Sequence, residues 1–451
     1  MKDKIFREYD IRGKVPGDIN EDVAYQIGLG YGSFLQEFLN QNTCVVGRDC
    51  RLSSENLTNS LIKGLLETGL NVIDYGFITT PMHYYTRHVN NLFGIMVTAS
   101  HNPKDENGFK FSFDEFANAR GIMIKDLKTY IDKGLFKKGS GKLEHKNIND
   151  DYINYVINGL KFGKKRIKVV LDPANGATTC IARSIFEKLN IDLTIINEEA
   201  DGNFPNHHPD PTIESNLEML KQKVLEVKAD IGIGFDGDGD RIGIIDEKGN
   251  MVSIESYAVI ILRNIIDKVE NKKFLYDPKC SDIFKDEILR LGGTPVICRT
   301  GTSYTQEKVI RENIPFGIQY VGHISLNDRV YSTESAMYSS LRLIEILSKT
   351  DKTLSELIAT VPAYFNTEEE KFPSQDDKKH LVIENIKNYC KEKNYSFIEI
   401  DGLRVSFKDS WAYVRASNTG PNITLRCEAK NKDDLENLQK LFKTLVELYN
   451  K

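Results

Sequence analysis

Three aspartates at alternate positions, Asp236, Asp238 and Asp240, are the most chemically distinctive group in the sequence. Glycines separate them, and the apolar run Ile231–Phe235 precedes them. Hard carboxylate oxygens suit Mg²⁺, and glycine lets the backbone bend tightly enough for the three side chains to converge. Carboxylates clustered in this way repel one another unless a cation lies among them. The sequence therefore predicts a Mg²⁺ site at these three aspartates.

Two other kinds of site place aspartates in a similar loop. If Asp236 is position 1 of an EF-hand loop, Glu247 falls at position 12, but position 6 requires glycine and holds Arg241. A helix should precede an EF-hand loop, whereas Ile231–Phe235 is typical of a strand. A haloacid-dehalogenase-like phosphatase also has an Asp-x-Asp pair after a strand, but this alternative leaves Ser100 without a role.

Ser100 lies in the run Val-Thr-Ala-Ser-His-Asn-Pro at residues 97–103. An apolar strand that ends in this run would leave the serine exposed and held in place. On spacing alone a turn is the better interpretation, because Ser and Asn commonly bond to the backbone in turns. A hydrolytic triad also needs a carboxylate that orients the histidine, and none is evident. Beside a metal and cationic side chains, however, Ser100 could be a nucleophile for phosphoryl transfer.

Two further segments carry polar groups that could bind a ligand. The run Arg-Ala-Ser-Asn-Thr-Gly at residues 415–420 offers a cation, two hydroxyls and an amide, which together can surround a phosphate. Its composition is also that of an ordinary turn, so this signal is weak alone. In the N-terminal run 6–13, Tyr9 and Arg12 either reach the binding site or belong to a charged edge strand.

The elements that must position these loops repeat three times along the chain. Each repeat has an apolar run, a helix-like segment, a second strand and a later apolar run that ends in a polar loop. The first runs are 43–47, 167–172 and 273–277, and the helices are 54–68, 179–189 and 283–291. The second strands are 71–74, 193–197 and 295–298, and the last runs are 94–97, 231–235 and 316–320.

Strands that alternate with helices indicate βα units and mainly parallel sheets. Ligands bind beyond the carboxyl ends of such strands, so the loops at Ser100, Asp236 and His323 should converge. The C-terminal stretch differs: a charged linker, 368–373, precedes a helix, four strands and a last helix at 432–449. We therefore expect an α/β protein, with three similar α/β domains containing mainly parallel mixed sheets plus a smaller C-terminal α+β domain, around one central cleft.

Composition excludes several classes of protein. The 451 residues exceed the roughly 250–300 that one core supports. A net charge of -5 gives no electrostatic footprint for nucleic acid. Seven scattered cysteines without a C-x-x-C pair indicate free thiols in a reducing cytosol. No run approaches the ~20 apolar residues that span a bilayer, so we expect a cytoplasmic protein with no membrane and no nucleic-acid partner.

In this order along the chain, the segments resemble the α-D-phosphohexomutases, and most closely their phosphomannomutase/phosphoglucomutase branch. The resemblance spans nearly the whole chain, and Thr-Ala-Ser-His-Asn-Pro together with Asp-Gly-Asp-Gly-Asp-Arg is its most specific part. The matching segments are 6–13, 98–103, 107–110, 236–241, 322–323, 401–405 and 415–419.

The resemblance implies an isomerase that interconverts the 1- and 6-phosphates of glucose or mannose through a phosphoserine and a sugar 1,6-bisphosphate, which also serves as activator. The implied catalytic residues are Ser100, Lys110, Arg12 and His323. The implied substrate-binding residues are Tyr9, Arg241, Lys279, Gln319, Val321, Arg415, Ser417, Asn418 and Thr419. Mg²⁺ would be held by Ser100, Asp236, Asp238 and Asp240. The partner would be a small phosphosugar, and the protein a monomer or homodimer.

The domains expected from this resemblance are 1–146 for the phosphoserine, 147–254 for the metal, 255–367 for the sugar and 368–451 for the phosphate. One loop departs from the family pattern Gly-Glu-x-Ser-Gly-His, whose Glu and Ser bind sugar hydroxyls. Gln319 and Val321 replace them here. Because groups that read a hydroxyl contribute strongly to specificity, sugar recognition should be weakened or redirected.

This departure leaves three alternatives open. The protein could be a mutase for a different phosphosugar, a phosphosugar-binding regulatory paralogue without turnover, or, as a minor alternative, a metal-dependent phosphatase. Retention of Ser100 and the three aspartates argues against a mere binding protein. If the altered loop causes the divergence, Gln319→Glu with Val321→Ser is expected to recover hexose activity.

Overall fold

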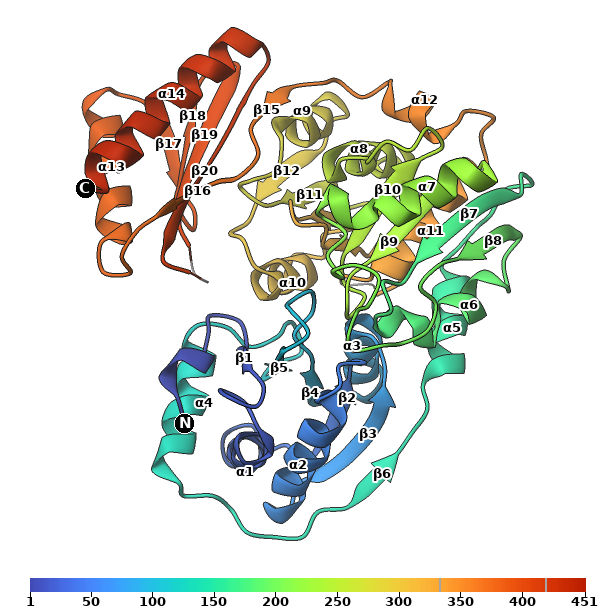
Figure 1. Cartoon of the computed structure of the whole chain (residues 1–451), viewed down its shortest axis with the longest axis vertical. Coiled ribbons are helices and arrows are strands. Elements are labelled where there is room, and N and C mark those ends of the chain that lie inside the picture. Colours follow the sequence, from blue (N-terminus) through green and yellow to red (C-terminus); the bar gives the residue numbers. More distant parts are fainter. Residues whose placement is uncertain (332–333, 418–419) are drawn as a thin grey trace.

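Four sheets organise the chain (Figure 1). The computed structural model describes residues 1–331, 334–417 and 420–451. In spatial order, the second sheet consists of β10 (Ile242–Asp246), β9 (Ile231–Phe235), β7 (Ile167–Asp172) and β8 (Ile191–Ile195). The third consists of β14 (Ile324–Leu326), β13 (Phe316–Ile318), β11 (Lys273–Tyr276) and β12 (Thr294–Ile297). The first contains β5 (Glu106–Phe111), β4 (Phe93–Val97), β2 (Thr43–Arg48) and β3 (Asn71–Phe77).

Strand direction follows one rule in these three sets. The last three strands of each set are parallel, and the first strand is antiparallel to its neighbour. The first sheet adds β1 (Ile11–Lys14), antiparallel to β5, and β6 (Leu143–His145), parallel to β3. The predicted arrangement of three similar α/β domains with mainly parallel mixed sheets is therefore confirmed.

Helices connect and cover the strands of all three sheets (Figure 1). The first domain contains η1 (Asp3–Ile5), α1 (Glu21–Phe38), α2 (Ser54–Glu67), α3 (Thr80–Asn90) and α4 (Ile122–Lys133). The second contains α5 (Asn149–Asn158), η2 (Ala177–Cys180), α6 (Ala182–Phe186), η3 (Glu214–Leu217) and α7 (Glu218–Val227). The third contains α8 (Ile254–Ile265), α9 (Asp282–Arg290), α10 (Thr302–Arg311), α11 (Ala336–Leu347) and α12 (Leu354–Ile358).

Glycine permits the closest helix contact in the first domain, where α1 packs against α2. A Cβ atom on Gly28 would lie 2.2 Å from the Leu61 carbonyl oxygen, and one on Gly64 would lie 2.3 Å from the Tyr25 carbonyl oxygen. At both positions a side chain would force the two backbones apart. The pair of helices supports the strands from which the Ser100 loop extends.

The helix predicted over residues 179–189 is wrong in length. The structure has the short 3-10 turn η2 followed by α6, which ends at Phe186. Ile181 separates them with φ at -137°, outside the helical range. The β-branched residues Thr178, Thr179 and Ile181 lose side-chain freedom in a helix, so the apolar periodicity overstates helix formation here.

The fourth domain is a small α+β unit, as predicted. Its elements are β15 (Phe365–Asn366), β16 (Glu370–Pro373), α13 (Lys379–Glu392), β17 (Ser396–Glu399), β18 (Leu403–Ser406), β19 (Ser410–Ala416), β20 (Asn422–Ala429) and α14 (Lys432–Tyr449). The linker predicted over 368–373 is wrong, because β16 pairs antiparallel with β20. Charged residues are common on edge strands, and Phe372 packs against the core of this domain.

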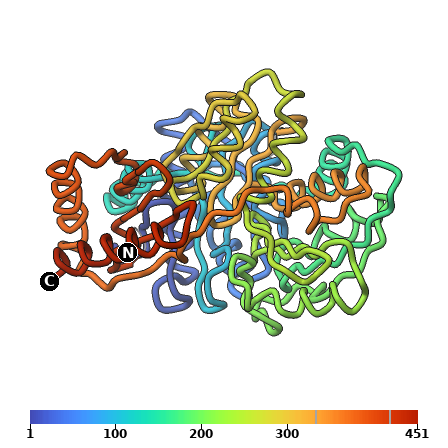
Figure 2. The backbone as a smooth tube through the Cα atoms, turned by 90° about the horizontal axis from the view of Figure 1, so that it is seen from above, coloured from blue at the N-terminus to red at the C-terminus, as the bar shows by residue number. Residues whose placement is uncertain are grey.

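Packing divides the molecule differently from the sheets. One hydrophobic core runs through the second and third domains and reaches the face of the first sheet that bears Val45 and Met96. The opposite face of that sheet, with Val46 and Ile95, has its own core, and so does the fourth domain. Figure 2 shows the fourth domain, in red, at one end of the molecule. Among the residues that the structure describes, no helix has the length and apolar character needed to cross a bilayer.

Candidate active site

A cavity of about 550 Å³ opens where the four domains meet. It brings together twelve residues that the sequence singles out, which come from every domain: Tyr9, Arg12, Ser100, Lys110, Asp240, Arg241, Lys279, Gln319, Val321, His323, Arg415 and Ser417. Asp236 and Asp238 are fully buried and join this group through Ser100 and Lys110. Two other predicted residues, Asn418 and Thr419, lie outside the described residues. The expected central cleft is confirmed.

Ser100 is held in a strained turn just beyond the end of β4. Its φ is +52°, in the left-handed region that non-glycine residues rarely adopt, and its backbone N–H donates to Thr98 Oγ1 at 2.9 Å. Its Oγ donates to Asp236 Oδ2 at 2.8 Å, and His101 Nδ1 lies 3.2 Å away. The turn interpretation is therefore correct, and the turn also places the hydroxyl against the carboxylate cluster.

Arg51, which the sequence analysis missed, holds the backbone of the Ser100 loop. Its guanidinium is buried and donates to the carbonyl oxygens of Ser100 at 2.8 Å, Asn102 at 2.7 Å, Pro103 at 2.7 Å and Glu106 at 3.0 Å. Only arginine has enough donors in a fixed fork to satisfy four acceptors at once. The available signal was its place in Asp-Cys-Arg at residues 49–51, which directly follows β2, a strand parallel to the β4 that precedes the Ser100 loop.

The loop after β9 folds around its first aspartate. Asp236 Oδ1 accepts backbone N–H groups from Gly239, Asp240 and Arg241 at 3.0–3.1 Å. A Cβ atom at Gly237 would lie 2.4 Å from the Ser100 carbonyl oxygen, so glycine is needed for the two loops to meet. Because β9 is a strand, the loop does not have the helical context of an EF-hand.

Lys110 Nζ lies between the other two aspartates, 2.7 Å from Asp238 Oδ2 and 2.9 Å from Asp240 Oδ2. Burial would lower the pKa of Lys110, but these two carboxylates outweigh it and raise that pKa well above its usual value. Burial alone would raise the pKa of Asp238, and Lys110 reverses this and lowers it. Burial and the neighbouring carboxylates of Asp240 and Asp238 raise the pKa of Asp236. One cation therefore does not neutralise the cluster.

The three aspartates fit a metal ion. Asp236, Asp238 and Asp240 each offer an oxygen within 4.8 Å of the others. Within the described part of the chain, the buried Asp238 Oδ1 has no hydrogen-bond partner, and Asp240 Oδ1 has only His323 Nδ1 at 3.5 Å. Buried carboxylate oxygens without donors are costly unless a cation contacts them. This donor set suits a hard divalent cation.

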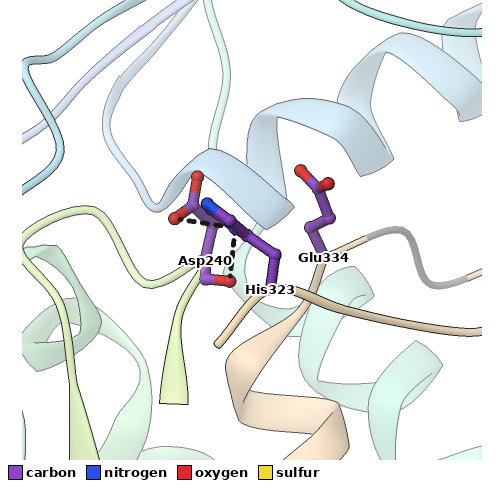
Figure 3. Close-up of side chains that lie close together, drawn as sticks. All are labelled: Asp240, His323 and Glu334. Atoms are coloured by element: carbon purple, nitrogen blue, oxygen red, sulfur yellow. Dashed lines mark hydrogen bonds and ion pairs between the residues drawn. The ribbon is translucent and has the colours of Figure 1, made fainter. Parts of the chain in front are cut away.

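His323 connects the metal loop to the third domain. Figure 3 shows it beside Asp240, whose carbonyl oxygen lies 3.2 Å from His323 Nδ1. His323 Nε2 accepts from Arg241 Nε at 3.0 Å, so the ring proton belongs on Nδ1. Burial lowers the pKa of His323 to about 4. The charge of Asp240 opposes this shift, and that of Arg241 adds to it. The neutral imidazole therefore holds the Arg241 guanidinium at the cavity wall.

The altered loop between β13 and β14 places Gln319 and Val321 on the cavity wall. Behind them lies Glu334, which the sequence analysis missed and which Figure 3 shows near His323. Burial, followed by the charge of Asp240, raises the pKa of Glu334. Nothing in the local sequence marks this residue, because its contacts are formed with other segments of the chain.

The far wall of the cavity comes from the fourth domain. Arg415, near the end of β19, donates to Asp401 Oδ2 at 2.9 Å, and Ser417 follows it at the cavity wall. Lys279 of the third domain pairs with Glu369 at 3.5 Å across the domain boundary. Arg415 and Lys279 therefore place cationic groups on this side of the cavity, as a site for a phosphate group requires.

Four family profiles match successive parts of the chain and together cover most of it. They are phosphoglucomutase/phosphomannomutase alpha/beta/alpha domain I over residues 3–137, domain II over 150–249, domain III over 254–364 and the C-terminal domain over 365–444. The chain is 36% identical to the phosphomannomutase/phosphoglucomutase of Pseudomonas putida, with 98% of this chain and 96% of the relative aligned. It is 32% identical to the phosphoglucomutase of Neisseria gonorrhoeae, over 98% of this chain and 96% of the relative.

Solved structures agree with this result. The crystal structure of a phosphoglucomutase/phosphomannomutase family protein from Burkholderia thailandensis superimposes with a TM-score of 0.93 at 31% identity, and it covers 100% of this chain and 98% of that one. A second crystal structure, from Thermus thermophilus, shares the fold at 20% identity and a TM-score of 0.81, and it covers 99% of this chain and 100% of that one. The resemblance noted in the sequence is confirmed, and the chain belongs to the phosphoglucomutase/phosphomannomutase family of enzymes.

Proposed function

We propose that this protein is a phosphohexomutase that interconverts the 1-phosphate and 6-phosphate of glucose or mannose. The observation that carries the proposal is the contact of Ser100 Oγ with Asp236 Oδ2 at 2.8 Å, at the wall of a cavity that all four domains line. Relatives that align over nearly the whole chain are named phosphomannomutase/phosphoglucomutase. The contact supports phosphoryl transfer at Ser100, and the names of the relatives support a mutase reaction.

In the proposed reaction, Ser100 carries a phosphoryl group. The bond between Ser100 Oγ and phosphorus breaks as a free hydroxyl of the sugar phosphate bonds to phosphorus. The hydroxyl loses its proton and Ser100 Oγ gains one, so the net proton transfer is from the sugar to the serine. This step gives a sugar 1,6-bisphosphate, which turns end for end and returns its other phosphoryl group to Ser100. Asp236, Asp238, Asp240 and Ser100 would hold Mg²⁺, which when bound supplies positive charge to the phosphoryl oxygens.

Three other residues support the transfer in this proposal. Lys110 stays protonated beside Asp238 and Asp240, so it neutralises developing charge rather than accepting a proton. Arg12 donates to the Ala99 carbonyl oxygen at 3.1 Å and faces the cavity, where it stabilises the same charge. His323, neutral at physiological pH, positions Arg241 instead of acting as an acid.

The non-reacting phosphate would be bound on the opposite side of the cavity. Arg415 and Ser417, with Asn418 and Thr419, form the proposed phosphate site, and Lys279 and Tyr9 add contacts from the third and first domains. The fourth domain has a separate core and meets the third through polar pairs such as Arg404–Asp282 at 2.9 Å. We propose that it moves as a unit when the sugar enters and turns.

Each of the four domains has a separate role in the proposed enzyme, which acts in the cytoplasm. Residues 1–146 would form the phosphoserine domain, 147–254 the metal domain, 255–367 the sugar domain and 368–451 the phosphate domain. All seven cysteines are free, which fits action in the reducing cytoplasm. We propose a monomer or homodimer that acts on a small phosphosugar without nucleic acid.

A panel of sugar phosphates tests this function. With Mg²⁺ and glucose 1,6-bisphosphate, the purified protein is expected to convert glucose 1-phosphate or mannose 1-phosphate into the 6-phosphate, followed by a coupled dehydrogenase assay. Preference for another sugar 1-phosphate would support a mutase with different specificity. Steady release of inorganic phosphate would indicate a phosphatase, and the absence of any turnover with intact folding would favour a regulatory binding protein.

Arg51 provides a prediction about positioning. Arg51→Lys keeps the charge but cannot donate to four carbonyl oxygens, so the Ser100 loop should shift. We expect kcat to fall about 100-fold, because displacement of a reacting group by 1 Å can cost that much, with little change in KM. Arg48→Ala is the matched control, since Arg48 lies on the same segment and pairs with Glu55 outside the cavity. An unchanged kcat in Arg51→Lys would contradict this role.

A further inference from the structure

A buried carboxylate lies directly behind the altered sugar loop. Glu334 is fully buried, and each of its oxygens meets a glutamine amide. Gln319 Nε2 donates to Glu334 Oε1 at 3.0 Å, and Gln306 Nε2 donates to Glu334 Oε2 at 3.0 Å. Gln306 comes from α10 and Gln319 from the end of β13, so three separate segments meet at this carboxylate.

The orientation of the first amide is fixed by a backbone group. Gln306 Oε1 accepts the N–H of Asn118 at 3.3 Å, so its Nε2 must face Glu334. Gln319 presents its Nε2 to the other oxygen of Glu334, so both oxygens of this carboxyl group act as acceptors. Gln319 also lines the cavity, and its backbone N–H is fixed by the His323 carbonyl oxygen at 2.9 Å. The amide oxygen, Oε1, is the side-chain atom of Gln319 that remains for a ligand.

We propose that Gln319 reads a hydroxyl of the bound sugar through Oε1, and that Glu334 is the positioning residue that keeps this oxygen toward the cavity. The inference rests on the proposed function and assigns its specificity. In the family pattern a glutamate in the loop offers acceptor oxygens to the sugar. Here the acceptor is retained as an amide oxygen, and the carboxyl group lies one layer deeper at residue 334.

This arrangement reverses the result expected from the loop sequence alone. Gln319→Glu restores the family residue but places a second carboxylate about 3 Å from Glu334, where two ionised groups repel strongly. Glu334→Gln is also unfavourable, because one amide oxygen cannot accept from both Gln306 and Gln319. Gln319 would then turn over and present a donor to the sugar.

The double variant Gln319→Glu/Glu334→Gln satisfies every partner again. The amide at 334 accepts from Gln306 and donates to the carboxylate at 319, whose other oxygen faces the cavity. Each single variant is expected to raise KM for the preferred sugar 1-phosphate about tenfold, with a smaller effect on kcat. The double variant is expected to return KM to within about threefold of wild type.

A second readout identifies the hydroxyl. Monodeoxy analogues of the preferred sugar 1-phosphate are compared in wild type and Glu334→Gln, and one analogue is expected to lose kcat/KM in wild type but not in the variant. For each variant, the intact mass shows that the protein carries the phosphoryl group, and the melting temperature shows that it is folded. If the wild-type protein isomerised no sugar phosphate, the proposed function itself would be contradicted.

With an active wild type, two results would overturn the inference. One is an unchanged KM in Glu334→Gln, since this variant mimics a protonated Glu334 that donates to Gln319. The other is a failure of the predicted exchange, seen either as Gln319→Glu with wild-type activity or as a double variant no better than the single ones. Loss of activity through unfolding alone would not be repaired by exchanging the two groups, so recovery in the double variant requires their direct coupling.

Discussion

Replacing Ser100 by alanine is expected to lower isomerisation of the preferred sugar 1-phosphate by about 10⁴-fold or more, because the group that receives and returns the phosphoryl unit is then absent. The fold should survive, since among the described residues Ser100 Oγ contacts only Asp236 and His101. Intact-mass measurement should show one phosphoryl group on wild type that is missing from the variant.

The exposed residue Ser140 offers a control for this experiment. Ser140→Ala should keep both the phosphoryl mass and full activity. If Ser100→Ala retained substantial turnover, phosphoryl transfer would have to use another nucleophile, and the proposed reaction would be wrong.

Loss of one carboxylate oxygen from the metal loop should have the second large effect. In Asp240→Asn, the amide oxygen can still accept from Lys110, which turns the amide nitrogen toward the place of the cation. We expect kcat/KM to fall about 10³-fold and the Mg²⁺ concentration for half activity to rise, because an electrostatic contact to the transferring group is lost. Calorimetry with Mg²⁺ on the dephosphorylated protein gives a readout independent of turnover.

Asp246→Asn is the matched control for the metal loop. Asp246 is buried at the other end of β10, where Oδ1 accepts the backbone N–H groups of Lys248 and Asn250 at 2.9 and 2.8 Å, and an asparagine can keep these bonds. Its Mg²⁺ dependence should equal that of wild type. Activity that persists in EDTA, or an Asp240→Asn variant with unaltered Mg²⁺ response, would refute the proposed metal site.

Local patterns were sufficient to predict much of the fold. Apolar runs that end in glycine-rich or polar loops, such as Ile231–Phe235, form strands because a buried strand must exclude polar groups until it leaves the sheet. The same logic failed at residues 179–189, where β-branched residues interrupt the helix, and at β16, where charge on an edge strand resembled a linker. The first failure lies in local helix propensity, and in the second the pairing with β20 outweighed the charged composition.

The site was predictable where its residues lie at strand ends and was not where they act from a distance. Ser100 and Asp236 occupy loops whose position follows from sheet topology. Arg51 and Glu334 are recognisable only by their partners, which are distant in sequence. Arg51 contacts Ser100, which lies 49 residues away along the chain. Glu334 contacts Gln319 and Gln306, which lie 15 and 28 residues away. A single sequence does not reveal such pairs, so the loop around Gln319 looked impaired, although in the structure Gln319 is bonded to the buried Glu334.

The core that joins the second and third domains to one face of the first sheet determines which parts of the protein unfold together. Val45 and Met96 bury their side chains in that shared core, while the fourth domain contributes none of its apolar residues to it. Cooperative units follow shared burial rather than sequence repeats. The three repeats that carry Ser100, the aspartates and His323 should therefore melt as one unit, and the C-terminal domain as another, so that the chain has four sheets but two thermal transitions.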